Sequence, residues 1–313
     1  MLPGAMRGLV VGSALVGLSW TILGGCHADP PAREVSAEAL LRYVDAQLAF
    51  GPRVPGSPAH RAMGRWLDSL LRSRADRVVV DDWLHVTAGG DTLALRNVLA
   101  RFLPASAERV LYVAHWDTRP HADAKASRDT IAPVLGANDG ASGVAVLLGV
   151  ADALHAKPPT LGVDLLFVDG EDYGSFTDTT ETLIGARRFV AGGALVPRPQ
   201  FAIVWDMVGD RDQRFLQEGE SLTAAPDVVS HVWELAGRLG YASRFVTEPR
   251  QGITDDQIPF QHAGVKAIDV IDLDYGPSNS WHHTTEDTRD KISGESLAVA
   301  AHVATALVRL GVK

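Results

Sequence analysis

Short apolar runs alternate with helical patterns from residue 110 to the end of the chain, and this alternation restricts the fold more than any other feature. The expected strands are residues 110–114, 163–168, 201–205 and 266–273. The expected helices are residues 142–156, 184–191, 226–239 and 293–310. Strands that alternate with helices form a mostly parallel sheet with helices on both faces. The pattern therefore predicts an α/β fold.

The segment before this alternation is expected to add an antiparallel hairpin to the sheet. Residues 78–86 and 92–102 have strand patterns, and Gly89-Gly90-Asp91 joins them as a turn. Ser57-Pro58 has the residue types that begin a helix, with a capping side chain followed by proline. No linker interrupts residues 36–313, so we expect one domain with a mixed, mostly parallel sheet.

The N-terminus carries an export pattern. Arg7 precedes an apolar stretch from Leu9 to Leu23, and Gly24-Gly25-Cys26 follows it. A basic residue, a short apolar region and small residues are typical of a secretory signal peptide. The apolar stretch is also short for a membrane-spanning helix. Leu23-Gly24-Gly25-Cys26 resembles the lipobox of bacterial lipoproteins, in which the cysteine is lipidated.

Cys26 is the only cysteine of the chain, so no disulfide can form within it. We expect a lipoprotein signal peptide at residues 1–25, a tether at residues 26–35 and a catalytic domain at residues 36–313. The lipidated protein would reside in the cell envelope and contact a membrane only through its anchor. A plain secretory signal with an incidental cysteine is the alternative.

Acidic residues and histidines follow the expected strands at the points where they end. These residues are His115, Asp117, Asp139, Glu171, Asp172, Asp206, His282 and His283. Crowded carboxylates repel one another unless a cation joins them, and mixed Asp, Glu and His ligands suit zinc. Unrelated polar groups on the surface are the alternative. The net charge of −9 argues against a nucleic-acid partner.

Glu171 and Asp172 stand side by side directly after the apolar run at residues 163–168. In open α/β sheets, ligands bind at the carboxyl ends of the strands. Adjacent side chains point in different directions, so one acid can bind a metal while the other transfers protons. A solvated acidic loop is the alternative interpretation of this pair.

Five motifs together resemble the zinc aminopeptidase superfamily and, within it, the bacterial glutaminyl cyclases (glutaminyl-peptide cyclotransferases). The motifs are Phe50-Gly51-Pro52-Arg53-Val54-Pro55-Gly56-Ser57, His115-Trp116-Asp117-Thr118-Arg119-Pro120, Gly136-Ala137-Asn138-Asp139-Gly140-Ala141-Ser142-Gly143, Glu171-Asp172-Tyr173-Gly174 and Asp255-Asp256-Gln257-Ile258-Pro259-Phe260. The resemblance covers nearly all of residues 36–313. It implies a zinc-dependent enzyme that acts on the N-terminus of a peptide.

The resemblance also implies roles for individual residues. Asp139, Asp172 and His283 match the zinc ligands of the family. Glu171 matches the glutamate that transfers protons. His282, the neighbour of His283, is the rival for the histidine ligand.

Further positions match residues around the family's site. Asp206 and Asp256 match two additional catalytic acids, and Trp281 matches an aromatic wall of the substrate pocket. Gln257 replaces a histidine that is common at its position. In two-zinc aminopeptidases, the residues that match His115 and Asp206 hold a second metal, whereas cyclases keep both residue types with a single zinc. One zinc per chain is the expectation here, with two as the alternative.

Two activities of the superfamily compete. In a cyclase, the α-amine of an N-terminal glutamine attacks its own side-chain amide and ammonia leaves, with Glu171 moving the proton. In an aminopeptidase, Glu171 acts as a base toward a water molecule that attacks the peptide bond. We expect a cyclase whose substrate is a peptide or protein with an N-terminal glutamine. A lipoprotein that has kept the fold without catalysis is a third possibility.

Overall fold

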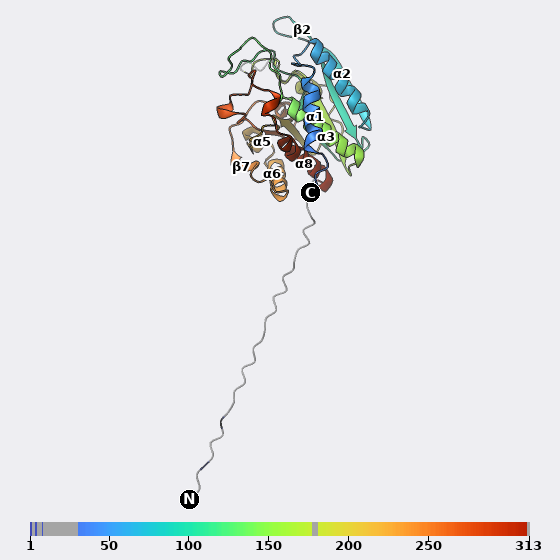
Figure 1. Cartoon of the computed structure of the whole chain (residues 1–313). Coiled ribbons are helices and arrows are strands. Elements are labelled where there is room, and N and C mark those ends of the chain that lie inside the picture. The colour runs from blue at the N-terminus through green and yellow to red at the C-terminus, as the bar shows by residue number, and fades with distance from the viewer. Residues whose placement is uncertain (2–3, 5–7, 9–30, 177–180, 312–313) are drawn as a thin grey trace. The chain divides into compact units, whose positions relative to one another are not determined.

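The computed structural model describes residues 1, 4, 8, 31–176 and 181–311 (Figure 1). The chain separates into the segment Met1–Pro30 and a compact unit, Pro31–Lys313, which contains the helices and strands given below. The predicted signal peptide and Cys26 fall on positions outside the described residues. Within the described ranges, no helix is long and apolar enough to cross a membrane.

A six-stranded mixed sheet runs through the compact unit. Its strands are β1 (Arg77–Val86), β2 (Thr92–Phe102), β3 (Arg109–His115), β4 (Gly162–Val168), β5 (Ala202–Asp206) and β8 (Ala267–Ile271). Their order across the sheet is β1-β2-β4-β3-β5-β8. β1, β2 and β4 pair antiparallel, whereas β4, β3, β5 and β8 pair parallel. The predicted hairpin thus forms one edge of a mostly parallel sheet.

The parallel strands end level with one another. His115 at the end of β3 pairs with Val168 at the end of β4. Asp206 at the end of β5 pairs with Ile271 at the end of β8. The carboxyl ends of these four strands therefore meet at one edge of the sheet, and the residues that follow them enter the same region.

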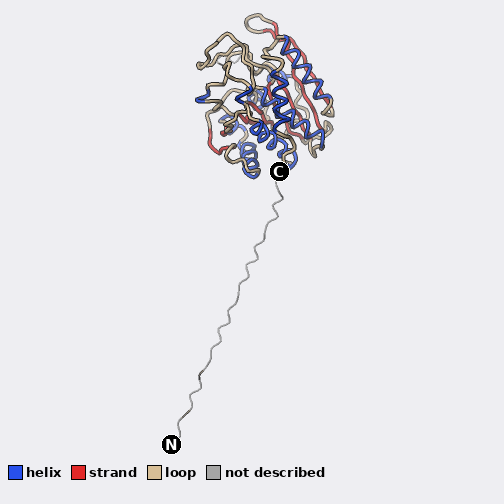
Figure 2. Tube along the Cα trace, in the orientation of Figure 1, coloured by secondary structure: helices blue, strands red, loops and turns tan. Residues whose placement is uncertain are grey.

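Helices cover both faces of the sheet (Figure 2). One face packs against α1 (Ala37–Leu48), α2 (Pro58–Arg72), α3 (Ala141–Ala156), α6 (Pro226–Arg238) and α8 (Gly294–Leu310). The other face packs against α4 (Ile184–Ala191) and α7 (Gln257–His262). In β3, Tyr112 and Ala114 face the first core, and Leu111 and Val113 face the second. Burial on both faces explains why the parallel strands are mostly apolar, with Asp164 in β4 and Asp269 in β8 as buried exceptions.

The first two helices begin at the residues that the sequence predicts. The Ser36 side chain accepts a hydrogen bond from the backbone N–H of Ala39 at the start of α1. Ser57 caps α2 in the same way through the N–H of His60, and Pro58 follows it. Such a cap is worth about 1 kcal/mol. Because capping is a local interaction, these helix starts are readable from the sequence.

Four short elements have no clear signature in the sequence. They are β6 (Phe215–Gln217), α5 (Gly219–Ala224), β7 (Phe245–Pro249) and α7. β6 and β7 form a separate parallel pair. Elements of this length do not complete enough periods of an apolar pattern to be recognised. The α7 helix has a bearing on the site because Asp255 and Asp256 lie directly before it.

Candidate active site

A cavity of about 540 Å³ opens where the parallel strands end. The predicted site residues that line it are Asp139, Glu171, Asp206, His282 and His283. Arg119 and Phe176 also line it, and Arg119 bonds to the buried carboxylate of Asp172. Residues from five separate segments of the sequence therefore meet in one place, as expected for the carboxyl edge of an α/β sheet.

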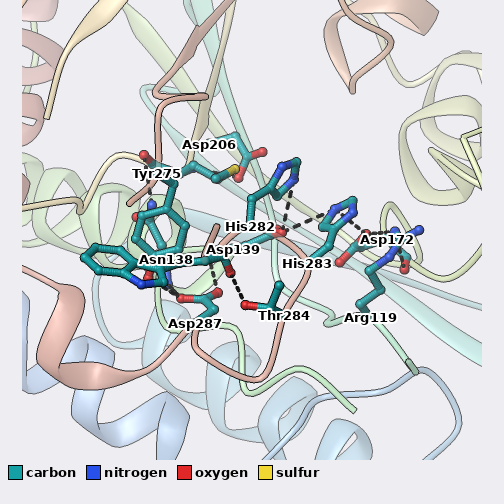
Figure 3. A network of polar contacts seen from close by, with 12 residues as sticks. Arg119, Asn138, Asp139, Asp172, Asp206, Tyr275, His282, His283, Thr284 and Asp287 are labelled. Carbon is teal, nitrogen blue, oxygen red and sulfur yellow. Dashed lines mark hydrogen bonds and ion pairs between the residues drawn. The ribbon is translucent and has the colours of Figure 1, made fainter. Parts of the chain in front are cut away.

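His283 lies between the other two predicted zinc ligands, Asp139 and Asp172. His283 Nε2 lies 3.6 Å from Asp139 Oδ2 and 3.4 Å from Asp172 Oδ1, and Figure 3 shows the imidazole between the two aspartates. The other oxygen of Asp172, Oδ2, and Asp139 Oδ2 are buried and have no hydrogen-bond partner in the described part of the chain. Buried carboxylate oxygens are costly without a partner. One imidazole nitrogen and two carboxylates are ligands that zinc accepts, so these residues fit a zinc ion.

The rival histidine, His282, lies next to this group. Its Nε2 is 3.9 Å from Asp139 Oδ2, and its Nδ1 lies 3.1 Å from Asn279 Nδ2. Burial and the neighbouring His283 lower the pKa of His282 to about 3. The ion pairs found in the described residues join His283 to both Asp139 and Asp172, but His282 only to Asp139. Asp139, His282 and His283 each offer a ligating atom within 4.8 Å of the others, so His282 stays the rival for the histidine ligand, although only His283 also pairs with Asp172.

Asp287 holds the loop that carries Asp139. Its carboxylate accepts hydrogen bonds from the backbone N–H groups of Asn138 at 2.8 Å and Asp139 at 3.2 Å. The hydroxyl of Tyr275 donates to the same carboxylate at 2.6 Å. Outer contacts of this kind orient the ligands of metal sites. The C-terminal loop thus supports Asp139 through Asp287 as well as supplying His283.

A second group of ligating side chains shares Asp139 with the first. His115 Nε2 lies 3.0 Å from Asp139 Oδ1 and 3.2 Å from Asp206 Oδ1. Burial lowers the pKa of His115, but the charges of Asp206 and Glu171 outweigh burial and raise this pKa well above its usual value. Gly140 permits this close approach, because a Cβ at that position would overlap the His115 ring. The arrangement suits a second metal ion or, equally, a histidine that bonds to two carboxylates.

Glu171 has the surroundings of a group that transfers protons. It lines the cavity but is only 4% exposed. Burial raises its pKa well above the usual range; His115 opposes the shift, whereas Asp172 and Asp256 add to it. Asp117 fixes the backbone here, accepting the N–H groups of Glu171 and Asp172 at 3.2 Å each. A carboxyl group with a raised pKa can accept and return a proton near neutral pH.

The two additional acids occupy different positions. Asp206 lines the cavity, whereas Asp256 is fully buried and is not among the lining residues. Burial and the charge of Asp255 raise the pKa of Asp256 well above its usual value. Gln257 is also buried, and its amide donates to the Ile253 carbonyl at 3.4 Å. Asp256 can therefore influence the site through its neighbours rather than by touching a ligand in the cavity.

Trp281 does not take the predicted position in the wall of this cavity. Its ring packs edge-on against Tyr275, with 5.4 Å between the ring centres, and it lines a neighbouring cavity of about 300 Å³. His282 and Phe176 line the main cavity instead. The side chains of the adjacent residues Trp281 and His282 leave the backbone in different directions, so a shift of one residue changes which of them reaches the site. Trp281 thus borders the neighbouring cavity, and its contact with a substrate stays a prediction.

Two residues to which the motifs assign no role border the predicted zinc ligands. The Arg119 guanidinium contacts Asp172 Oδ1 through Nη1. It also donates to both carboxylate oxygens of Asp123, from Nε at 2.8 Å and from Nη2 at 2.6 Å. Arg119 belongs to the motif that begins at His115, and Asp123 follows it by four residues with the opposite charge. Because residues 119–123 form no helix, this spacing does not by itself predict the pair, and the structure reveals it.

The family of the chain follows from a comparison with protein-family models. The model of Peptidase family M28 matches residues 97–308, which is more than half of the chain. The chain belongs to peptidase family M28. The matched region extends from β2 to the end of α8 and contains all the residues that line the main cavity. The predicted zinc ligands thus lie in the part of the chain that defines an M28 protein.

Solved structures and curated relatives of this M28 protein carry two kinds of names. The glutaminyl cyclase of Bacteroides thetaiotaomicron, bound to N-acetylhistamine, is 33% identical with a TM-score of 0.83, covering 91% of this chain and 100% of that one. A leucine aminopeptidase precursor from the same species is 33% identical with a TM-score of 0.84, covering 90% and 100%.

A glutaminyl-peptide cyclotransferase-like protein of Bos taurus is 26% identical over 271 residues, covering 75% of this chain and 66% of the bovine protein. The match thus spans slightly less than two thirds of that relative. Together with the two structures, it confirms the predicted α/β fold and the resemblance to glutaminyl cyclases.

Proposed function

We propose that this M28 family member is a glutaminyl-peptide cyclotransferase, which converts the N-terminal glutamine of a peptide or protein to pyroglutamate and releases ammonia. The observation that favours the cyclase is the similarity to glutaminyl cyclases, while the position of Glu171 provides the proton transfer that either activity needs. Glu171 is a buried carboxyl group with a raised pKa, it lines the cavity, and it adjoins the zinc ligand candidate Asp172. Similarity to a glutaminyl cyclase over 91% of this chain supports the same chemistry.

The proposed reaction takes place within one glutamine residue of the substrate. The nitrogen of the α-amine attacks the carbon of the side-chain amide and forms a new C–N bond. The bond from that carbon to the amide nitrogen breaks. Glu171 accepts a proton from the attacking amine and delivers a proton to the leaving nitrogen, so that ammonia departs. Holding the two reacting groups in line supplies much of the acceleration, on the order of several kcal/mol.

Asp139, Asp172 and His283 would hold one zinc ion, which supplies a Lewis acid for the oxygen of the side-chain amide. One ion is favoured over two because two ligands of this set, Asp139 and Asp172, each have a buried carboxylate oxygen, Oδ2, without a hydrogen bond in the described part of the chain. At the neighbouring position, His115 Nε2 already lies within hydrogen-bond distance of Asp139 and Asp206. A second ion would have to replace those contacts.

The remaining predicted residues would place the substrate. Asp206 lines the cavity and would face the α-amine. Asp256 is buried and would act through Glu171, whose pKa it helps to raise. Trp281 lines the smaller cavity, which shares the segment 280–286 with the main cavity. Contact of Trp281 with substrate residues that follow the N-terminal glutamine is therefore the role proposed for it.

An aminopeptidase is the second candidate, and the His115 group favours it. His115, Asp139 and Asp206 each offer one ligating atom, and these three atoms lie within 4.8 Å of one another. This group could hold a second metal ion beside the first. In that case Glu171 would take a proton from a water molecule that attacks the peptide carbonyl, and the N-terminal residue would be released.

One experiment separates the two activities. The purified protein is analysed for zinc and then incubated in parallel with a peptide that begins with glutamine and one that begins with leucine. For the cyclase we expect about one zinc per chain, ammonia release and a product of the same length that has lost only ammonia. Free leucine together with two zinc ions per chain would instead establish the aminopeptidase.

We also propose that the protein is a lipoprotein of the cell envelope. The proposal is supported by the basic residue Arg7, by the apolar stretch that follows it and by the lipobox-like residues before Cys26. Lipidation of Cys26 would provide the membrane contact. Its test, a substitution of Cys26, is described with the other predictions.

A further inference from the structure

Asp123 connects two of the three proposed zinc ligands. Its Oδ1 lies 3.5 Å from Nδ1 of His283. The same carboxylate accepts two hydrogen bonds from the guanidinium of Arg119, at 2.8 and 2.6 Å. Arg119 in turn contacts Oδ1 of Asp172, and His283 Nε2 lies 3.4 Å from that same oxygen. Asp123, Arg119, Asp172 and His283 thus form a closed ring of polar contacts, of which Figure 3 shows the Arg119, Asp172 and His283 part.

The two nitrogens of His283 face different partners. Nε2 faces the carboxylates of Asp139 and Asp172, whereas Nδ1 faces Asp123. A neutral imidazole carries one proton, and the group that accepts a hydrogen bond from one nitrogen decides which nitrogen keeps it. When Nε2 binds zinc, the remaining proton of the neutral imidazole resides on Nδ1, where the carboxylate of Asp123 faces it. Carboxylates in this position are common partners of zinc-binding histidines.

Arg119 connects Asp123 to the second proposed zinc ligand, Asp172. Its side chain is 3% exposed, so its orientation depends on the partners at both ends of the guanidinium. Asp123 and the Gly174 carbonyl accept from Nη2, and Asp172 accepts from Nη1. Holding Arg119 in this way leaves Oδ2 of Asp172, which has no hydrogen bond in the described part of the chain, free to bind an ion.

We infer that Asp123 is a positioning residue for zinc. Its carboxylate faces Nδ1 of His283 and holds Arg119 against Asp172, so that both ligands are directed at the metal position. The inference rests on the zinc site of the proposed function. The ordinary alternative is a surface ion pair between Asp123 and Arg119, which would be worth about 0–1 kcal/mol and would not affect the site.

The chain offers a matched control for that alternative. Asp68 pairs with Arg72 at 2.9 Å, and the two residues are four positions apart, as Asp123 and Arg119 are. Asp68 lies on α2 and is not among the residues that line the main cavity. Asp68→Ala therefore removes an ion pair of the same type without changing the contacts of His283.

The test compares Asp123→Ala with Asp68→Ala and with the conservative variant Asp123→Glu. The zinc Kd of each purified protein is measured by competition with a chelator. We expect Asp123→Ala to weaken zinc binding by about 10–100-fold, as for other partners of metal-bound histidines. Asp123→Glu should recover most of the affinity because it restores a carboxylate, and Asp68→Ala should bind zinc like the wild type. If Asp123→Ala does not fold, Asp123→Asn takes its place.

A second measurement examines the histidine itself. Proton–nitrogen NMR of the zinc-bound protein reports which nitrogen of His283 carries a proton, and His283→Ala identifies the signal. The wild type and Asp68→Ala should show a proton on Nδ1 that exchanges slowly with water, whereas in Asp123→Ala this proton should exchange faster because no carboxylate faces it. An unchanged zinc Kd with an unchanged Nδ1 proton signal in Asp123→Ala would overturn the inference, and so would an equal loss of zinc affinity in Asp68→Ala.

These readouts separate the inference from the proposed function. A protein that binds zinc through His283 but forms no pyroglutamate would contradict the cyclase and leave the role of Asp123 intact. A wild-type His283 protonated mainly on Nε2 would contradict the role of Asp123, whatever the enzyme does to glutamine.

Discussion

The substitution Glu171→Gln tests the chemistry most directly. Glutamine keeps the size and hydrogen-bonding reach of the side chain but cannot carry the proton from the amine to the leaving nitrogen. General acid–base groups contribute about 10²–10⁴-fold to a rate, which corresponds to about 3–5 kcal/mol of activation free energy. We expect the upper half of this range because Glu171 is 4% exposed, so bulk water has little access to take over its role.

The variant should remain folded and keep its zinc. Burial raises the pKa of Glu171 well above its usual value, so the folded protein favours the neutral side chain. For a carboxyl group with a raised folded-state pKa, stability is greatest at low pH and falls as the pH rises through that pKa. Glutamine does not ionise and avoids this loss. In the metal-free protein at neutral pH, Glu171→Gln should therefore unfold at the wild-type temperature or above it.

The assay follows ammonia release from a peptide that begins with glutamine, together with zinc content and thermal unfolding. Asp172→Asn is the companion variant, which should lose zinc along with activity because it alters a proposed ligand. Ammonia release at the wild-type rate by Glu171→Gln would refute the proposed mechanism. Loss of zinc from Glu171→Gln would mean that the roles of Glu171 and Asp172 have to be exchanged.

Three further predictions concern the metal site and the anchor. His283→Ala should remove bound zinc and His282→Ala should largely spare it, as measured by elemental analysis; the opposite pattern would make His282 the ligand. His115→Ala should keep near-stoichiometric zinc if the site holds one ion, whereas a fall from two zinc ions to one would support the aminopeptidase. Cys26→Ala should release the protein from membranes or leave it unprocessed, and unchanged membrane fractionation with an unchanged mature mass would count against lipidation.

The larger features of the fold are visible in the sequence because they arise from local patterns. Strands buried on both faces are mostly apolar, so β3, β4 and β5 appear as short apolar runs between helical segments. Ser36 and Ser57 lie within three residues of the backbone groups that they cap. Parallel strands direct their carboxyl ends to one edge, which is why polar residues at those ends predict a common site before any contact is known.

The details within that site depend on loops whose conformation no local pattern specifies. His283 adopts a positive φ of 55°, and this dihedral helps to determine which of the adjacent side chains, Trp281, His282 or His283, faces the cavity. Contacts from distant segments hold the loop: Trp281 packs on Tyr275, and Asp287 bonds to the loop that carries Asp139. The expectation of an aromatic wall at Trp281 came from the family resemblance, and the sequence does not reveal the direction in which this loop residue points.

The contacts of Asp123 illustrate the same division. The charge of Asp123 is plain in the sequence, and so is its distance of four residues from Arg119. Its approach to His283 joins positions 160 residues apart and exists only because the segment after β3 and the loop after β8 fold over the same edge of the sheet. By itself, the sequence determined the α/β architecture and the set of residues able to bind zinc. The tertiary structure decided which of them face one another, because side-chain direction in loops is set by packing between segments that are distant in the chain.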